Sequence, residues 1–359
     1  ADDYLGALHC EIDRYAAILG DIEIGSVYIG GGTPTTVIDD LGRLVAHLRE
    51  RFRHDGLVAI ETTPEDLDAI NTAKLREAGI DLLSIGVQSF DDRYLKYLGR
   101  RHRSAMLKPV IEGALAAGFD TVNLDLMFAL PGQTTEEALA DLDNAISLGA
   151  EQVTLYPLFT FPYSAVGRHL RLTNVDFPRL GARRQMYRAI HEHALANGFE
   201  RVSVWGFRKG ATERFSSVTR DHYIGLGAGA ATCLPGTFYF NTFSIPAYTQ
   251  RSLAQESTVS LQMDMSAAMT RFYWLYWRLY ETHVPKAGFE RRFADDTRLR
   301  VLLQLAVLLG LITAIEGDYV LTERGAFWIH LMQNYYVLNY IDKVWSRSMR
   351  EAWPGRIEL

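Results

Sequence analysis

The stretch SVYIGGGTP, residues Ser26–Pro34, joins a short apolar run directly to three glycines and a proline. The apolar run predicts a strand, and glycines permit backbone torsions and a close ligand approach that other residues hinder. Exposed N–H groups at the carboxyl end of a strand suit a carboxylate, and the carbonyls beside them suit an ammonium. A tight turn into a helix explains the triplet as well, so the motif alone does not establish a binding site.

Working outward from this stretch, short apolar runs alternate with longer segments of helical periodicity. Such alternation predicts a parallel sheet, because parallel neighbours need a crossover and a helix usually provides it. The spacing suits a partial (β/α)6 barrel of the TIM type, in the α/β class. The predicted strands are Ser26–Ile29, Leu57–Glu61, Leu82–Gly86, Thr121–Met127, Gln152–Tyr156 and Arg201–Trp205. The predicted helices are Leu41–Phe52, Pro64–Ala78, Asp91–Leu98, Ala105–Ala117, Thr135–Leu148 and Leu180–Asn197.

The pattern changes after residue 230. A strand is predicted at Phe238–Phe240, a connection at Ile245–Ser260, and helices at Met269–Val284, Leu299–Leu309 and Gly325–Tyr340. Gly317-Asp318 is a turn signal between two short strands, which completes an order typical of a winged helix. A basic recognition face is lacking, so the module is expected to be a lid or docking domain. The predicted domains are a barrel at 1–235, a connection at 236–260 and a helical, winged-helix-like domain at 261–359.

The composition narrows the functional class. The chain has 359 residues, 48% of them hydrophobic, and a net charge of −6, so no basic field recruits nucleic acid or anionic lipid. The apolar stretch Leu302–Ile312 is too short to span a bilayer, and no secretory signal is visible. We therefore expect a cytoplasmic protein without membrane partners. Because the first residue is Ala1, we also expect the natural chain to begin earlier.

Only two cysteines, Cys10 and Cys233, occur in the sequence. Two reduced thiols are the favoured interpretation, because nothing near them indicates a secreted disulfide framework. Neither belongs to a closely spaced metal-binding motif.

Polar residues follow two of the predicted strands. Glu61 ends the second strand, and a carboxylate at that end of a barrel strand usually faces the site. It could instead interact with the amino terminus of the next helix. Gln88 follows the third strand, where a neutral amide can bond a ligand without adding charge, or can simply close the loop.

Two charged residues complete the candidate set. The guanidinium of Arg100 can donate two hydrogen bonds to one carboxylate, so it could hold the amino-acid end of a ligand. Arg101 is expected to be solvated. Asp125 lies inside the apolar strand and must be paired or site-facing, because burying an unpaired carboxylate is costly. A ribose diol is a plausible partner for it.

A second glycine-rich run, Gly225–Ala231, resembles a dinucleotide fingerprint only loosely. No acidic residue follows at the expected distance in a further β/α unit, so we reject that interpretation. Two explanations of these glycines remain: close approach of the backbone to a ligand, and tight packing.

Taken in order, these segments resemble the oxygen-independent coproporphyrinogen III oxidase-like branch of the radical S-adenosylmethionine (SAM) enzymes. The resemblance extends from about residue 4 to residue 231 and more weakly beyond. It is carried by Ile29–Pro34, Glu61–Pro64, Ser84–Phe90, Leu98–His102, Asp125–Gln133 and Gly225–Ala231.

The resemblance implies a [4Fe–4S] cluster held by a C-x3-C-x2-C loop, an external electron donor of flavodoxin or ferredoxin type, and two SAM molecules. By position, Gly31, Glu61 and Ala231 match contacts to one SAM, and Phe159 matches a further contact position with a different residue type. Contacts to the other SAM are matched by Gly32, Thr33, Gln88, Arg100 and Asp125. No C-x3-C-x2-C occurs in the chain, so the resemblance places the cluster ligands before Ala1, and truncation without radical chemistry is the alternative.

The residues that match contacts to the second SAM are retained in this chain. They predict a C-methyltransferase or cyclopropanase that acts on a planar heteroaromatic molecule, in natural-product biosynthesis for example. The aromatic helix Phe272–Tyr280 could stack on such a substrate, although ordinary packing explains it better. Two alternatives stay open: coproporphyrinogen decarboxylation, and a haem chaperone that uses the barrel as a carrier. The sequence does not identify the catalytic residues.

Overall fold

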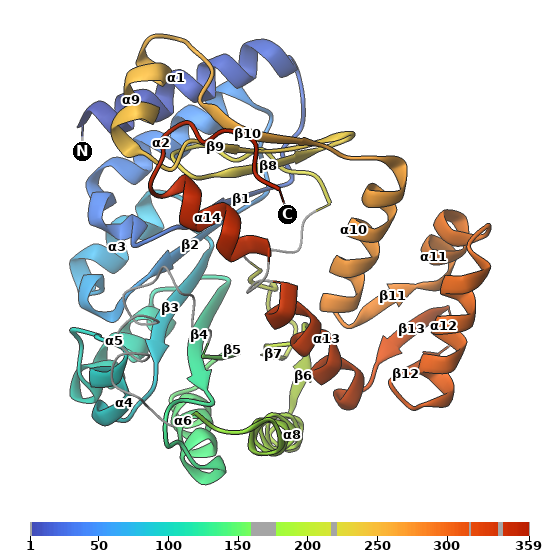
Figure 1. Cartoon of the computed structure of the whole chain (residues 1–359). Coiled ribbons are helices and arrows are strands. Elements are labelled where there is room, and N and C mark those ends of the chain that lie inside the picture. The colour runs from blue at the N-terminus through green and yellow to red at the C-terminus, as the bar shows by residue number, and fades with distance from the viewer. Residues whose placement is uncertain (1, 159–176, 217–220, 316, 337–339, 359) are drawn as a thin grey trace. The chain divides into compact units, whose positions relative to one another are not determined.

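The computed structural model describes residues 2–158, 177–216, 221–315, 317–336 and 340–358. These residues form two compact units (Figure 1). The first comprises the described residues up to 201 together with 205–216, and the second comprises 202–204 and the described residues from 221 onward. The predicted domain boundaries at 235 and 260 stay a proposal, although the second unit already begins before residue 235.

The first unit is built on a seven-stranded sheet (Figure 1). Its first five strands are parallel neighbours, and the last two form an antiparallel hairpin on the edge of the fifth. In spatial order the strands are β1 (Ser26–Ile29), β2 (Leu57–Thr62), β3 (Leu82–Gln88), β4 (Thr121–Phe128), β5 (Gln152–Pro157), β7 (Gly206–Lys209) and β6 (Phe199–Arg201). The predicted α/β fold with a parallel sheet is therefore confirmed.

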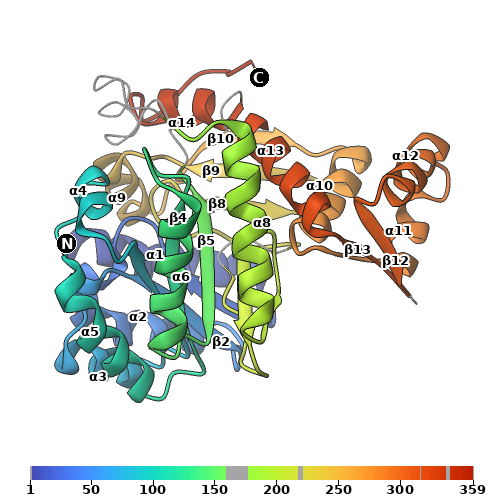
Figure 2. The ribbon, with the colours of Figure 1, turned by 90° about the horizontal axis from the view of Figure 1, so that it is seen from below.

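Helices connect the parallel strands. Figure 2 shows α6 and α8 side by side along the outside of the sheet. The 3-10 turns are Pro34–Val37 and Pro64–Asp66. The helices are α1 (Asp2–Leu19), α2 (Ile38–Arg51), α3 (Ala69–Glu77), α4 (Asp92–Tyr97), α5 (Ser104–Ala116), α6 (Thr135–Ser147) and α8 (Leu180–Ala196).

Local chemistry sets where several of these helices begin. Thr134 precedes α6 and forms a reciprocal capping box with Glu137, which satisfies two N–H groups that the first turn leaves unpaired. Asp68 caps α3 by accepting a hydrogen bond from the Asn71 N–H, so the predicted helix 64–78 begins only at Ala69, after a 3-10 turn.

The two faces of the sheet differ because side chains alternate along each strand. One face carries the fully buried Ile60, Leu83 and Leu124 on three adjacent strands. The other face carries Glu61, Ser84, Asn123 and Gln152, which the parallel register aligns in one row across β2, β3, β4 and β5. The apolar row forms the core, and the polar row faces the candidate site.

The predicted sixth strand, Arg201–Trp205, is wrong. The chain bends at residues 203–205, and the strands lie on either side of the bend as the β6–β7 hairpin. Trp205 is instead a core residue, 1% exposed, that packs edge-on against Tyr187 and also contacts Phe128. The apolar content of this run therefore reflects packing of one large side chain rather than a strand.

The second unit begins with a three-stranded antiparallel sheet of order β10 (Val259–Asp264), β9 (Thr237–Asn241), β8 (Ala231–Leu234). The predicted connection at 245–260 is wrong, because it contains α9 (Ile245–Leu253) and the start of β10. Ser244 starts that helix by accepting a hydrogen bond from the Ala247 N–H.

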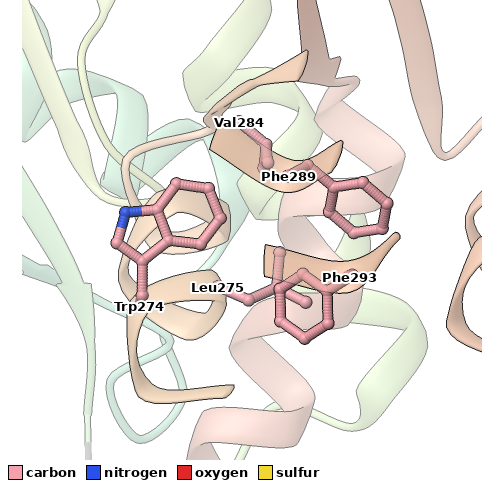
Figure 3. Packing of buried hydrophobic residues seen from close by; sticks show 5 residues of the cluster. All are labelled: Trp274, Leu275, Val284, Phe289 and Phe293. Atoms are coloured by element: carbon pink, nitrogen blue, oxygen red, sulfur yellow. The ribbon is translucent and has the colours of Figure 1, made fainter. Parts of the chain in front are cut away.

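The rest of the second unit has the element order of a winged helix. A three-stranded sheet of order β11-β13-β12 packs with helices around Trp274, Leu275, Val284, Phe289 and Phe293, whose side chains converge in Figure 3. The aromatic helix therefore uses Trp274 and Leu275 for packing. The elements are α10 (Ala267–Tyr280), β11 (His283–Pro285), α11 (Lys286–Phe293), α12 (Thr297–Leu308), β12 (Ile312–Ile315), β13 (Asp318–Leu321), α13 (Glu323–Tyr336) and α14 (Asp342–Ser348).

Within the described ranges of the chain, no helix combines the length and the apolar character that crossing a membrane requires.

We predict that Leu124→Ala lowers the free energy of unfolding by about 2–5 kcal/mol, because it removes a fully buried side chain from the centre of the sheet. Leu195→Ala is the matched control, since that leucine is 45% exposed on α8 and its truncation leaves no cavity. Chemical denaturation of both variants measures the difference. Equal losses of stability would contradict the assignment of this strand to the core.

Candidate active site

The candidate site lies on the polar face of the first unit. Its floor is an apolar cluster in which Phe215 packs against Ala59 and Leu82, with Tyr28 and Leu57 beside them. The Phe215 backbone is held by the Gln152 side chain through two hydrogen bonds of 2.9 and 3.0 Å. Ala59 and Leu82 precede Glu61 and Ser84 on their strands, so this floor lies on the amino-terminal side of the polar row.

The glycine turn follows β1 at that end. Gly31 and Gly32 have φ values of +87° and +69°, a region that favours glycine, and both residues are exposed with open space where a side chain would stand. Thr33 is half-buried beside them. The structure thus leaves the backbone of this turn accessible to a ligand, although turn geometry accounts for the glycines too.

Glu61 is anchored by a residue that the sequence did not single out. The Tyr28 hydroxyl donates a hydrogen bond to the Glu61 carboxylate. That hydroxyl stands where a Cβ at residue 30 would lie, so a larger residue in place of Gly30 would displace the Tyr28 ring. The first glycine therefore serves packing of Tyr28, and Glu61 faces the site rather than the next helix.

Asp125 is the centre of a hydrogen-bond network. The Ser84 hydroxyl donates to its Oδ2 at 2.9 Å, and the Asn123 amide donates to its Oδ1 at 2.9 Å. The Asn123 amide also reaches the Ser84 Oγ at 2.7 Å, and its carbonyl oxygen accepts from Thr154 at 2.9 Å. The network ties β3, β4 and β5 together and fixes the carboxylate in one orientation.

The environment shifts the acidity of this carboxyl group. Burial raises the pKa of Asp125 to about 7, and the charge of Glu61 adds to the rise. The hydrogen bonds from Ser84 and Asn123 and the charge of Arg100 act against the rise without cancelling it. A carboxyl group whose pKa lies this far from its ordinary value is typical of a functional site.

Arg100 belongs to the same electrostatic group. Burial lowers the pKa of its guanidinium, while the charges of Glu65 and Asp125 act in the opposite direction. Its loop is anchored by His102, whose N–H donates to Glu65 at 3.0 Å and whose Nε2 lies 3.0 Å from the Val87 carbonyl. Arg101, one residue on, is exposed, as the sequence predicts.

Gln88 ends β3 with a φ of +70°, which is uncommon for a residue other than glycine. The backbone register shifts just before it, and the side chain is buried. The next turn is fastened to α6, because Asp141 accepts hydrogen bonds from the Ser89 hydroxyl at 2.8 Å and the Phe90 N–H at 2.7 Å. A strained backbone conformation that the surrounding contacts hold in place often marks a binding site.

Two predicted positions remain, Phe159 and Ala231. Phe159 falls outside the described residues. Ala231 begins β8 in the second unit, where its carbonyl stands 2.1 Å from the position of a Cβ on Gly225. The glycines at 225–229 therefore serve close packing, as their Asn241 hydrogen bond to the Gly227 carbonyl also indicates, and no dinucleotide loop is formed.

The donor set for an iron–sulfur cluster is not formed by these residues. Where the structure describes the chain, it contains no group of three or more His, Cys, Asp and Glu side chains placed to hold a metal ion. Cys10 is half-buried on α1, and Cys233 is buried on β8 of the other unit. The residues present therefore do not fit a three-cysteine cluster. The Glu61, Arg100 and Asp125 group, by contrast, offers both charge signs that an amino-acid sulfonium ligand needs.

Comparison with known proteins gives a consistent result. The family described as the Radical SAM superfamily matches residues 10–145. The heme chaperone HemW of Bacillus subtilis is 31% identical over 254 residues, which cover 69% of this chain and 67% of that protein. The heme chaperone HemW of Haemophilus influenzae is 34% identical over 342 residues, which cover 90% of this chain and 85% of that protein.

Among solved structures, coproporphyrinogen III oxidase (HemN) of Escherichia coli, described as a radical SAM enzyme, superposes with a TM-score of 0.79. The match covers 94% of this chain and 83% of that one at 21% sequence identity, so this likeness shows the fold alone.

We predict that the pH dependence of stability differs between the wild type and Asp125→Asn. The Asp125 carboxyl has a pKa of about 7 when folded against an ordinary 3.8, so the folded chain holds an extra proton between these values. The free energy of unfolding of the wild type therefore falls, relative to the variant, as the pH rises from about 4 to about 7. Denaturation at a series of pH values measures the difference, with the exposed Asp120→Asn as control. Parallel profiles for the wild type and Asp125→Asn would contradict the shifted pKa.

Proposed function

The chain belongs to the radical SAM family, in the group that contains HemW, and from this membership we propose that it is a heme-binding protein that also binds SAM. The observation that carries the proposal is 31–34% identity, over most of the chain, to proteins named heme chaperone. The family implies SAM and a [4Fe–4S] cluster as cofactors. The number of SAM molecules is part of the proposal.

For SAM, we assign roles to the strand-end residues. The Arg100 guanidinium binds the carboxylate of the amino-acid end, because it is a half-buried cation beside Asp125. Asp125 accepts hydrogen bonds from the ribose hydroxyls, and Gln88 donates from its amide to the ligand. Gly31, Gly32 and Thr33 offer backbone groups, and Glu61 stands ready for the ammonium group. Bound SAM supplies an activated sulfonium centre.

Ala231 and Phe159 keep the positions that the family pattern gives them. Both assignments rest on the resemblance.

Coproporphyrinogen III oxidation is the second candidate. It is favoured by 26% identity over 267 residues to the oxygen-independent coproporphyrinogen III oxidase of Paracoccus denitrificans. The predicted methyltransferase or cyclopropanase activity receives no support from the relatives named above. Its supporting feature, the set of strand-end residues, serves SAM binding in either case and does not distinguish the substrates.

We predict that hemin added to the purified chain gives a shifted Soret band that survives gel filtration, because a heme carrier must hold its ligand during transfer. Absorbance titration measures the binding, with the urea-unfolded chain as the control for nonspecific association. A spectrum identical to that of free hemin would refute heme binding. Conversion of coproporphyrinogen III, followed by porphyrin fluorescence after oxidation, would instead favour the oxidase.

We predict that Arg100→Ala weakens SAM binding about tenfold or more, because it removes a charge-assisted hydrogen bond to a carboxylate. Arg101→Ala is the matched control and should change the affinity by less than about twofold, since an exposed arginine contributes little. Isothermal titration calorimetry with SAM measures both. If the two variants lose equal affinity, the assignment of Arg100 fails.

A further inference from the structure

Gln88 lies at the centre of a three-residue turn at the carboxyl end of β3. The Val87 carbonyl accepts a hydrogen bond from the Ser89 N–H at 2.9 Å, which closes the turn across Gln88. The φ of Gln88 is +70°, so this is the rare form of the turn, in which the backbone of the central residue is strained. A strained conformation persists only where surrounding contacts hold it, and contacts are present on both sides of the residue.

The turn sets the direction of the Gln88 side chain. Its Nε2 stands 2.9 Å from the position that a Cβ on Gly86 would occupy, so the glycine leaves room for the amide. Gly86 lies two residues after Ser84 and therefore on the same face of the strand, and Ser84 is the residue that donates to Asp125. The backbone torsion at Gln88 thus directs its amide toward the face that carries the candidate site.

The contact before Gln88 comes from His102, which is 1% exposed. Its Nε2 lies 3.0 Å from the Val87 carbonyl oxygen, the same atom that accepts from the Ser89 N–H. A carbonyl oxygen only accepts, so Nε2 carries a hydrogen and donates it. Both lone pairs of that oxygen are then used, and the peptide that precedes Gln88 is held from outside the strand.

The contact after Gln88 comes from α6. Asp141 accepts hydrogen bonds from the Ser89 hydroxyl at 2.8 Å and from the Phe90 N–H at 2.7 Å. It fixes the chain beyond the turn but does not reach the peptide before Gln88. His102 therefore has a task that the bonds to Asp141 do not perform.

The same imidazole ring also contacts the segment that follows β2. Its Nδ1 lies 3.3 Å from Oε2 of Glu65, and the backbone N–H of His102 donates to Oε1 of that carboxylate at 3.0 Å. Burial lowers the pKa of Arg100, two residues before the histidine, and the charge of Glu65 acts against this shift. One buried side chain therefore contacts the end of β3 and the carboxylate that stabilises the charge of Arg100.

We propose that His102 is a positioning residue, which directs Gln88 into the candidate site by donating from Nε2 to the Val87 carbonyl. Its contact with Glu65 ties that turn to the loop of Arg100, so that two residues proposed to bind SAM are placed by one side chain. The part of the inference that concerns SAM rests on the proposed function. The part that concerns the turn does not.

Two amide substitutions separate the nitrogens of the ring. In His102→Gln the side-chain amide nitrogen takes the place of Nε2 and can still donate to Val87. In His102→Asn the amide nitrogen takes the place of Nδ1, next to Glu65, and the bond to Val87 is lost. His54→Gln is the matched control, because it removes a bond of 2.8 Å from a histidine Nδ1 to the Ile24 carbonyl, which lies before β1.

The first readout needs no ligand and is the hydrogen exchange of the Ser89 N–H, measured by NMR in the full chain. We expect about tenfold faster exchange or more in His102→Asn, because loss of a hydrogen bond lets the strained turn open. Exchange in His102→Gln and His54→Gln should stay within about threefold of the wild type. Circular dichroism establishes that each variant is folded. Unchanged exchange in His102→Asn, or equal acceleration in His102→Gln, would overturn the inference.

A measurement on the wild type alone checks the position of the hydrogen. The nitrogen NMR shifts of the ring should show a hydrogen on Nε2 of His102 in the folded chain, because the Val87 carbonyl can only accept. A ring that carries its hydrogen on Nδ1 alone would overturn the inference, whatever the variants do.

The second readout is the affinity for SAM, measured by calorimetry. We expect His102→Asn to bind SAM about tenfold more weakly or worse, and His102→Gln to bind like the wild type. The double variant His102→Asn with Gln88→Ala should bind as Gln88→Ala does, because a positioning residue acts only through the group that it positions. Additive losses would overturn the positioning role. Exchange that changes as expected in a chain that binds no SAM would refute the proposed SAM binding and support the role of His102 in the turn.

Discussion

The hydrogen bonds from Ser84 and Asn123 to the Asp125 carboxylate are the constraint on which the first unit depends. They exist because the parallel register sets Ser84 beside Asn123, with Asp125 two residues on along the same strand and so on the same face. A slip of one residue would turn these groups toward the buried face and bring apolar side chains into the site. The buried core and the candidate site therefore depend on the same strand register.

The two units divide the chemistry between them. The first unit collects polar and charged groups at the carboxyl ends of its strands and closes the space below them with an apolar floor around Phe215. The second unit uses its aromatic residues for its own packing, and the outer side of α12 stays exposed. The polar group in the first unit supports the proposed ligand binding. Each feature is explained by the residues of its own unit.

The strand-end motifs are shared by radical SAM proteins with different tasks, which is why they led to the right family and to a methyltransferase prediction that its relatives do not support. In the proposed assignment Gly31, Gln88, Arg100 and Asp125 bind SAM, so a substrate does not have to touch them. The relatives named heme chaperone resemble the chain over its length, including segments without recognisable motifs. Identity spread over the chain is thus more informative about the ligand than the motif residues are.

The sequence by itself determined the five parallel strands, most of the helices and the residues at the strand ends, because periodicity, glycines and caps act over a few neighbouring residues. Asn123 and Asp125, two apart in a buried strand, could also have been predicted to share a face. Only the tertiary structure decided that Tyr28 bonds Glu61, that Arg100 is half-buried near Asp125 while Arg101 is exposed, that Trp205 joins the core, and that α12 has one uncovered side. These outcomes depend on contacts between residues far apart in the chain, and local pattern carries no information about such distances.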